Sequence, residues 1–206
     1  MTARRGTVGA DHPRDGRGRV LPDPSWPSDR AAPGRLELVR RFCNTANREN
    51  GADRLAEPDG LASWLRAERL PPLPATDVDG GQIIAFREHL HGLTRAHATG
   101  EPSEPDLHGL ADLLAPVCFT VAAGVDGLHL APHGPDGQDG FLGVLGLTVI
   151  DAQYRGTWPR LKACLQCGWV VYDSSKNRSG RWCSMTACGG REHARTYRRR
   201  RSGWPR

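Results

Sequence analysis

The sequence has no long hydrophobic run. Its longest apolar stretch, residues 141–150, is interrupted by glycine and threonine and is too short to cross a bilayer. The N-terminus is polar and lacks the apolar segment that follows the positive start of a secretion signal. We therefore expect a cytoplasmic protein without a membrane partner. In such a reducing compartment disulfides are rare, and clustered cysteines usually bind metal or react.

The sequence also lacks the usual arrangements of an enzyme. It contains no glycine-rich phosphate loop of the right form, no nucleophile paired with a base and no convincing pair of catalytic carboxylates. His89, His91 and His97 fall within one expected helix, where such side chains are more often surface or half-buried groups than metal ligands. We therefore expect a protein that is not an enzyme.

Acidic residues are scarce at the C-terminal end of the chain. From Trp158 onward, 12 Lys and Arg stand against only Asp173 and Glu192, a balance of +10. The remaining residues hold 16 basic and 21 acidic side chains, so the net charge of +5 hides two regions of opposite sign. Such a split indicates a C-terminal tail that binds a polyanion and a preceding body that does not.

The composition divides the chain into three expected parts. Residues 1–34 carry five Pro, five Gly and few apolar side chains, which predicts a disordered extension. Residues 35–155 are expected to form a mainly helical domain, α+β in class with one small β-hairpin. Apolar residues recur at helical spacing near 36–46, 61–65, 83–97, 107–114 and 136–153, and they alternate near 117–130 around an Asp126-Gly127 turn. Residues 158–206 are expected to form a small separate module that ends in a basic helix.

Four of the six cysteines form two close pairs. Two residues separate Cys164 from Cys167, four separate Cys183 from Cys188, and fifteen lie between the pairs. Each pair lets a tight turn bring two sulfurs to one cation, and two such turns complete the tetrahedral shell of one structural Zn²⁺. Residues 158–206 are therefore expected to form a small zinc-stabilised finger. Weaker alternatives are a redox Cys-x-x-Cys, a disulfide staple, a catalytic zinc with an open position, and His193 in place of one cysteine.

The segments around the second cysteine pair have their own patterns. Residues 169–173 (WVVYD) alternate like a strand, and residues 181–185 (RWCSM) can return as its partner. A helix that starts near Gly189 would place Arg191, Arg195 and Arg198 on one face. The expected nucleic-acid-binding residues are Arg191, Arg195, Arg198, Arg199, Arg200 and Arg201. For Arg191, a nucleic-acid contact and a structural role beside the metal both stay open.

These residues resemble the CGNR zinc-finger family. The match runs through RLKAC, CGW, the Asp of VVYDSSKNRSGRWCSM, and Cys188-Gly189-x-Arg191. The resemblance implies that the four paired cysteines are zinc ligands and that the module binds DNA. Gly190 stands where the family has Asn, so any contact of that amide is absent and the helix is locally less stable.

The part before the finger is similar to the ABATE-type domain. The stretch LELVRRFCNTANRENGADRLAEPDGLASWLRAERL carries a helix that ends in Asn-Thr, followed by an Asp-Arg-Leu turn into a Trp-Leu helix. The pair of domains resembles stress-induced transcription regulators, which implies a sensory role for the first domain. Asn44, Thr45 and Arg54 are candidates to line a ligand pocket there, although a helix-end cap is the simpler account of Asn44.

Two functions are compatible with these patterns. The favoured one is a DNA-binding transcription regulator whose arginines contact phosphates and guanine edges of double-stranded DNA. The alternative is a zinc-stabilised protein–protein interaction module whose basic tail binds an acidic partner, and RNA is a further candidate ligand. A homodimer would suit a regulator, although no heptad pattern in the sequence indicates one.

Overall fold

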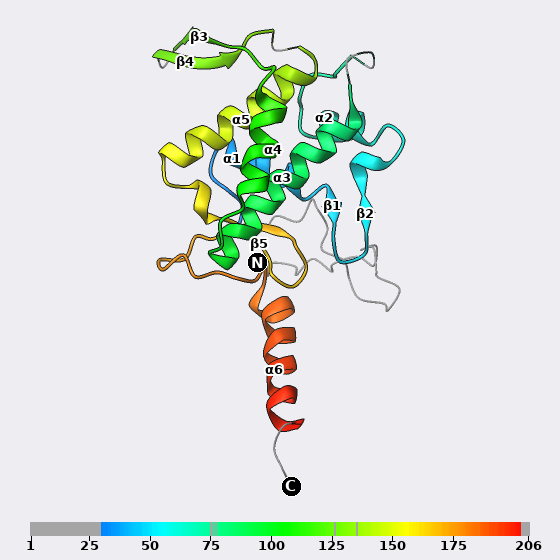
Figure 1. The fold of residues 1–206 in the computed structure, drawn as a ribbon, viewed down its shortest axis with the longest axis vertical. Coiled ribbons are helices and arrows are strands. Elements are labelled where there is room, and N and C mark those ends of the chain that lie inside the picture. Colours follow the sequence, from blue (N-terminus) through cyan, green and yellow to red (C-terminus); the bar gives the residue numbers. More distant parts are fainter. Residues whose placement is uncertain (1–29, 75, 77, 126, 135, 203–206) are drawn as a thin grey trace, which may run out of the picture.

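The computed structural model describes residues 30–74, 76, 78–125, 127–134 and 136–202 (Figure 1). Most of the predicted disordered extension, residues 1–29, lies outside the described residues, and so does Asp126 of the predicted hairpin turn. The described chain is mainly helical with small antiparallel strand pairs, and a helix follows the cysteine-rich segment. The predicted fold class is thereby confirmed.

The body of the molecule consists of the helices that the apolar spacing predicted. They are α1 (Leu36–Cys43), α2 (Gly60–Ala67), α3 (Gly80–Thr99), α4 (Glu104–Leu114) and α5 (Gly137–Tyr154). The longest of them, α3, begins after Asp79, whose carboxylate accepts a hydrogen bond from the Gln82 amide. It ends at Gly100, whose φ of 82° is a backbone conformation that residues with a side chain rarely adopt.

An aromatic cluster lies at the centre of this body. Phe42 of α1, Trp64 of α2 and Phe141 of α5 are buried, and their ring centroids are 5.3–6.0 Å apart. The rings are tilted or edge-on, an arrangement that stabilises beyond the area buried. Phe86 and Leu90 of α3 are fully buried in the same core. Residues from four segments of the sequence therefore meet in one apolar centre.

In the described part of the chain, three short antiparallel hairpins are attached to the helices. They are β1 (Ala46–Asn47) with β2 (Ala52–Asp53), β3 (Phe119–Gly124) with β4 (Gly127–Pro132), and β5 (Leu161–Ala163) with β6 (Val170–Tyr172). Hairpin β3–β4 is the one predicted from alternation, and it extends beyond the helices at one end of the molecule (Figure 1). Short 3₁₀ turns cover Arg54–Ala56 (η1) and Trp158–Arg160 (η3).

The partner of strand β6 differs from the predicted one. The sequence predicts residues 181–185, but β6 pairs with β5 in the register Ala163↔Val170. The Cys164–Cys167 turn joins these two strands directly, and the Cys164 N–H donates to the Trp169 carbonyl at 2.9 Å. Closing this short turn costs less chain entropy than pairing across the later loop. Residues 181–185 are free of strand pairing and instead carry Cys183 back to the first cysteine pair.

The finger shares the apolar core of the helical body. Trp158, Leu161, Ala163 and Val170 are buried in the same cluster as the aromatic rings. Strand β5 contacts α3, and β6 contacts α1. The domain boundary expected between residues 155 and 158 stays a prediction, because apolar side chains from both sides of it pack in one core.

The chain segment just before α1 is ordered by contacts rather than by its own composition. Ala32 is buried, and its N–H donates to the Glu37 carboxylate at 2.7 Å. The Arg30 guanidinium donates to the Trp182 carbonyl at 2.7 Å, and the Arg30 carbonyl accepts from the Tyr172 N–H at 3.0 Å. Residues 30–34 therefore differ from the disorder predicted for residues 1–34, since these long-range partners leave no trace in local composition.

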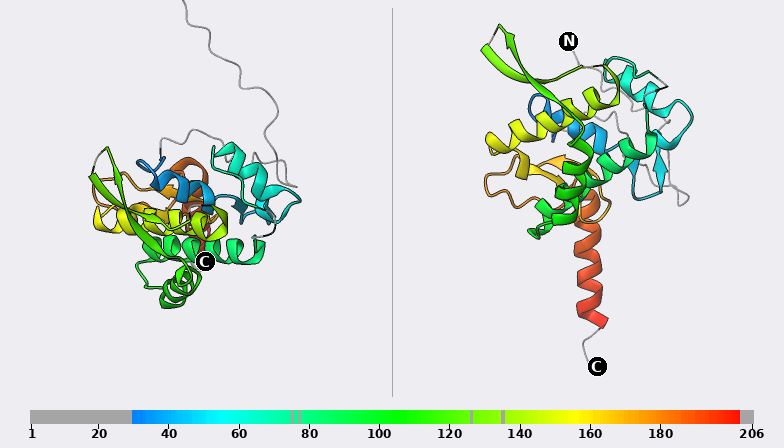
Figure 2. Two further views of the ribbon diagram at one scale, coloured as in Figure 1. Left: turned by 90° about the horizontal axis from the view of Figure 1, so that it is seen from above. Right: turned by 45° about the horizontal axis from the view of Figure 1, so that its top comes forward.

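Helix α6 (Gly190–Ser202) follows a π-helical turn, Met185–Gly189 (η4), as predicted for a helix starting near Gly189. It extends from the finger away from the body, and hairpin β3–β4 lies at the opposite end of the longest axis (Figures 1 and 2). In the described ranges, none of the helices combines the length and the apolar character needed to cross a membrane.

The shared core predicts that a cavity in the finger destabilises the helices as well. Leu161→Ala removes a fully buried side chain of β5 and should lower the free energy of unfolding of the helical body by about 2–5 kcal/mol. Urea denaturation followed by helical circular dichroism measures this. Leu107→Ala, at an exposed position of α4, is the matched control and should change little. An unchanged urea midpoint of the helical transition in Leu161→Ala would show that the finger unfolds independently of the helical body.

Candidate metal centre and basic helix

Four cysteine sulfurs meet at the base of helix α6. Cys164 and Cys167 lie in the turn between β5 and β6, Cys183 lies in the following loop, and Cys188 lies in the π-helical turn η4. All four sulfurs are within 4.8 Å of one another. The Cys183 sulfur is 3.7 Å from that of Cys167 and 3.5 Å from that of Cys188. The structure thus brings together the four residues that the spacing singled out.

The donor set fits one structural zinc. At a Zn–S distance of about 2.3 Å, a regular tetrahedron places its sulfurs about 3.8 Å apart, close to the separations found here. Cys164, Cys167 and Cys188 are buried, and the half-buried rings of Trp169 and Trp182 pack against them. Four sulfurs fill the coordination shell and leave no position for a substrate, as in structural rather than catalytic sites.

The charges of the four thiols are coupled. Hydrogen bonding to the Cys167 thiol lowers the pKa of Cys164, whereas the contact with Cys164 raises the pKa of Cys167 and of Cys183. One thiolate among close sulfurs disfavours a second, unless a cation offsets the repulsion. Zinc binds the thiolate form, so such a cation would allow all four to ionise. By contrast, burial raises the pKa of the Cys43 thiol in the core to about 12.

Two glycines near the metal centre have different roles. Gly168, directly after Cys167, has a φ of 75°, and an added Cβ would lie 2.8 Å from the Arg48 side chain. This position therefore requires glycine. Gly190 has an ordinary helical conformation, and an added Cβ would make only an ordinary contact with the Met185 carbonyl at 3.4 Å. The structure has room for the Asn that the family carries at this position. Glycine is therefore not required here for steric reasons.

Arg191 links the metal centre to the helical body. Its Nη2 donates to the Cys188 sulfur at 3.1 Å, and its Nη1 forms an ion pair with the Glu49 carboxylate at 2.5 Å. The hydrogen bond to Glu49 raises the pKa of Arg191 further, so this guanidinium is always charged. Both ends of the planar group are used inside the protein. The structure therefore favours the structural role for Arg191 that the sequence left open.

The turn between β1 and β2, which carries Glu49, is itself fixed to α3. The Arg87 guanidinium is buried and donates to both oxygens of Asp53 at 2.6 Å. Arg48 forms an ion pair with Glu88 at 2.8 Å. Burial of Arg87 opposes its charge, but the Asp53 carboxylate more than compensates and raises the pKa of Arg87. Glu49 is thus presented to Arg191 from a well-supported turn.

Side chains of the body also hold the backbone of the finger. Asn44 donates from Nδ2 to the Val170 carbonyl at 2.9 Å and accepts from the Val170 N–H at 2.8 Å. His91 Nε2 lies 2.8 Å from the Gly168 carbonyl, and His97 Nδ1 lies 2.8 Å from the Leu161 carbonyl. Burial lowers the pKa of His91 to about 4, so its neutral ring donates from Nε2. Sequence reasoning named Asn44 for other roles and gave no role to the two histidines.

The three candidate pocket residues lie near one another, but the polar groups described below make hydrogen bonds within the protein. Thr45 is buried and donates to the Phe42 carbonyl at 2.8 Å. Arg54, half-buried at the start of η1, donates its backbone N–H to the Thr45 carbonyl at 3.0 Å. Of the three, only Asn44 contacts the finger, through Val170, whereas Thr45 and Arg54 make contacts within the body. A ligand role for Asn44, Thr45 and Arg54 stays a prediction.

A buried ion pair organises the loop between the cysteine pairs. Lys162 of β5 contacts Asp173 at 3.0 Å and donates to the Arg178 carbonyl. Asp173 also accepts from the N–H groups of Ser175 and Gly180. Burial opposes the ionisation of Asp173, but these hydrogen bonds and Lys162 prevail and lower its pKa. The loop is therefore folded around one charged carboxylate before it delivers Cys183.

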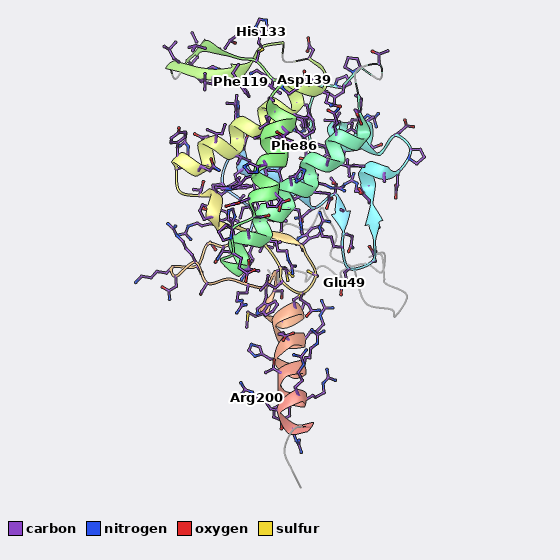
Figure 3. All side chains as sticks on the ribbon, in the orientation of Figure 1. Glu49, Phe86, Phe119, His133, Asp139 and Arg200 are labelled. Atoms are coloured by element: carbon purple, nitrogen blue, oxygen red, sulfur yellow. The ribbon has the colours of Figure 1, made fainter. Side chains whose placement is uncertain are left out.

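Helix α6 carries exposed arginines beyond its anchored first turn. Arg195 contacts Gln166 at 3.2 Å and Glu192 at 3.1 Å, and the Arg201 guanidinium lies 5.7 Å from the centroid of the Tyr197 ring. The remaining predicted residues of the helix, all exposed, are Arg198, Arg199 and Arg200. Figure 3 shows Arg200 at the side of the helix, near its C-terminal end. Unlike Arg191, which is half-buried, these side chains are exposed on the helix.

Two family models match the chain. Residues 36–151 match ABATE, described as "Putative stress-induced transcription regulator", and residues 160–201 match the CGNR zinc finger. The first match covers the helical body, and the second covers β5, β6, the cysteine site and most of α6. No curated protein matches the chain. The two models agree with the architecture that the sequence resemblance implied.

The cysteine site predicts a stoichiometry of one zinc per chain. Cys188→Ser removes one thiolate while keeping the size of the side chain, and we expect zinc content to fall well below one equivalent, because serine is a poor zinc ligand. Metal analysis of the purified full-length protein measures this. Cys43→Ser, at a core position away from the site, is the control and should retain the metal. Full zinc in Cys188→Ser would remove this residue from the ligand set.

The contact between Glu49 and Arg191 predicts an effect on how firmly the metal is held. Glu49→Gln keeps the shape but removes the charge, and zinc transfer to a chromogenic chelator should become faster by about tenfold, as for other groups that support metal ligands. Glu101→Gln, at an exposed position after α3, should leave the rate unchanged. Equal rates in the two variants would show that the ion pair does not support the site.

Proposed function

The chain belongs to the ABATE family, since that model matches more than half of its residues, and we propose that it regulates transcription by binding double-stranded DNA through α6. In this proposal Cys164, Cys167, Cys183 and Cys188 hold one zinc, which fixes the start of the helix. The observation that carries the proposal is the exposed row Arg198–Arg201 on a helix whose first turn is joined to the cysteine site.

The shape of α6 suits the major groove of DNA. An α-helix with its side chains is about 10–12 Å wide, and the major groove of B-DNA is about 12 Å wide. Four consecutive arginines point in directions that differ by about 100° from one to the next, so they surround most of the helix. A helix lying in the groove has a phosphate backbone on either side. The row Arg198–Arg201 therefore suits contacts to both backbones better than base reading.

Charge separates the proposed DNA-binding end from the rest of the molecule. The part from Trp158 onward has a balance of +10, and the part before it is net negative. A polyanion is therefore attracted to one end of the molecule and repelled from the body. In this proposal Arg191 positions the helix, and the nucleic-acid contacts come from Arg195 and Arg198–Arg201.

The helical body is the proposed sensory part. It is joined to the base of α6 by Glu49, whose turn is fixed to α3 through Arg87 and Asp53. A change in the position of this turn would alter the contact with Arg191 and thus the direction of the helix. The matched families are of regulator and zinc-finger type rather than enzymes, in keeping with a role in binding.

Salt dependence gives the direct test of this proposal. With about five arginines on phosphates, the log–log slope of affinity against salt should be about −4.5 for the zinc-loaded full-length protein. The double variant Arg198→Gln, Arg200→Gln should reduce the slope to about −2.7, because each lost contact removes about 0.9. Fluorescence anisotropy with a labelled duplex measures both.

The matched control is the double variant Arg66→Gln, Arg95→Gln, which removes the same charge from exposed positions of α2 and α3. It should keep the wild-type slope. Equal losses in the two double variants would reduce the effect to net charge. Binding that survives zinc chelation unchanged would reduce α6 to a flexible polycation. A preference for single-stranded RNA would favour RNA as the ligand, and no binding of nucleic acid at low salt would favour an acidic protein partner.

A further inference from the structure

Hairpin β3–β4 has one face made only of uncharged, mostly apolar side chains. The register pairs Val121 with Leu130 and Ala123 with Leu128. Residues directly opposite in an antiparallel pair share a face, as do alternate residues of one strand. The apolar hairpin face consists of Phe119, Val121, Ala123, Leu128 and Leu130. The other face carries Thr120, Ala122 and His129.

This apolar hairpin face is open to solvent in the single chain. The exposed fraction is 67% for Val121, 79% for Leu128 and 55% for Leu130, and Val125 in the turn is fully exposed. An isolated two-stranded hairpin is only marginally stable in water and needs a surface to pack on. Figures 1 and 2 show the hairpin extending past the helices, and α5 contacts it through β4, so the described helices supply that surface only in part.

The apolar surface continues onto the outer side of α5. Pro132 lies on the same face of the hairpin as its partner Phe119, and an added Cβ at Gly143 of α5 would lie 2.9 Å from its ring. Beyond this contact, Ile150 and Tyr154 of α5 are exposed. The opposite side of α5 is buried in the core, and the exposed ion pair between Asp151 and Arg155 lies beside these two side chains. The apolar surface of α5 therefore has a charged edge.

We propose that a second copy of this chain covers the apolar hairpin face and the exposed end of α5. Taking about 150–200 Å² for each whole side chain, the exposed fractions leave on the order of 700 Å² of apolar surface per copy. A standard interface buries about 800 Å² per partner, so two copies packed face to face approach the area of a stable dimer.

The chemistry of the face also suits a symmetric partner. A two-fold interface must complement itself, and an uncharged face does so without any pattern of opposite charges. The strongly basic helix α6 lies at the opposite end of the longest axis (Figure 1), so pairing of the hairpin ends does not force the two helices together. The dimer would leave both copies of α6 free to contact a ligand.

Sedimentation velocity of the full-length protein over a range of concentrations tests the proposal. The wild type should sediment as a dimer at micromolar concentrations. Leu128→Asp places a charge on the face beside the turn of the hairpin, and the dissociation constant of the dimer should rise by at least about tenfold. Val121→Asp, on the facing strand, should have the same effect. Both positions are exposed in the single chain, so neither change disturbs its fold.

Thr120→Asp is the matched control, because it adds the same charge to the same hairpin on the opposite face. It should leave the dimer intact, and circular dichroism should be unchanged in all three variants. A wild type that stays monomeric at every concentration would overturn the proposal, and so would a dimer that tolerates Leu128→Asp and Val121→Asp. The measurement needs no nucleic acid, so its outcome is independent of DNA binding by α6.

Discussion

The seat of β5 and β6 on the helical body is the contact on which the rest of the finger depends. Leu161 and Val170 enter the core of the body, and the Asn44 amide makes two hydrogen bonds with the backbone of Val170. The turn between these strands holds Cys164 and Cys167. Half of the metal site is therefore built on a surface that the body supports, and only the other cysteine pair depends on the loop.

Anchoring at two points explains how a helix without an apolar face is given a direction. Helix α6 is so rich in arginine that it has little to bury against the body. Cys188 joins its base to the other three sulfurs, and Arg191 joins it to Glu49. Because these links lie on different segments, they limit rotation of the helix as well as its separation from the body.

Local patterns in the sequence predicted the elements, but not the contacts between them. Helical spacing predicted α3, and cysteine spacing predicted the four sulfurs that meet at the site. The pairing of β6 with β5 was missed, because two segments compete for one strand and alternation alone does not choose between them. The partner of Arg191 lies 142 residues away, and no local pattern marks Glu49.

The distribution of charge along α6 links binding to the order of the helix. Arg195 is one turn from Arg198 and Arg199, and Arg198 is one turn from Arg201, so like charges face each other on the helix. Each such pair destabilises a helix by a few tenths of a kcal/mol. The anchored first turn, with Glu192 near the positive end of the helix dipole, opposes this loss. In the proposed complex, phosphates that neutralise the arginines would remove this repulsion, and the second half of the helix would gain order.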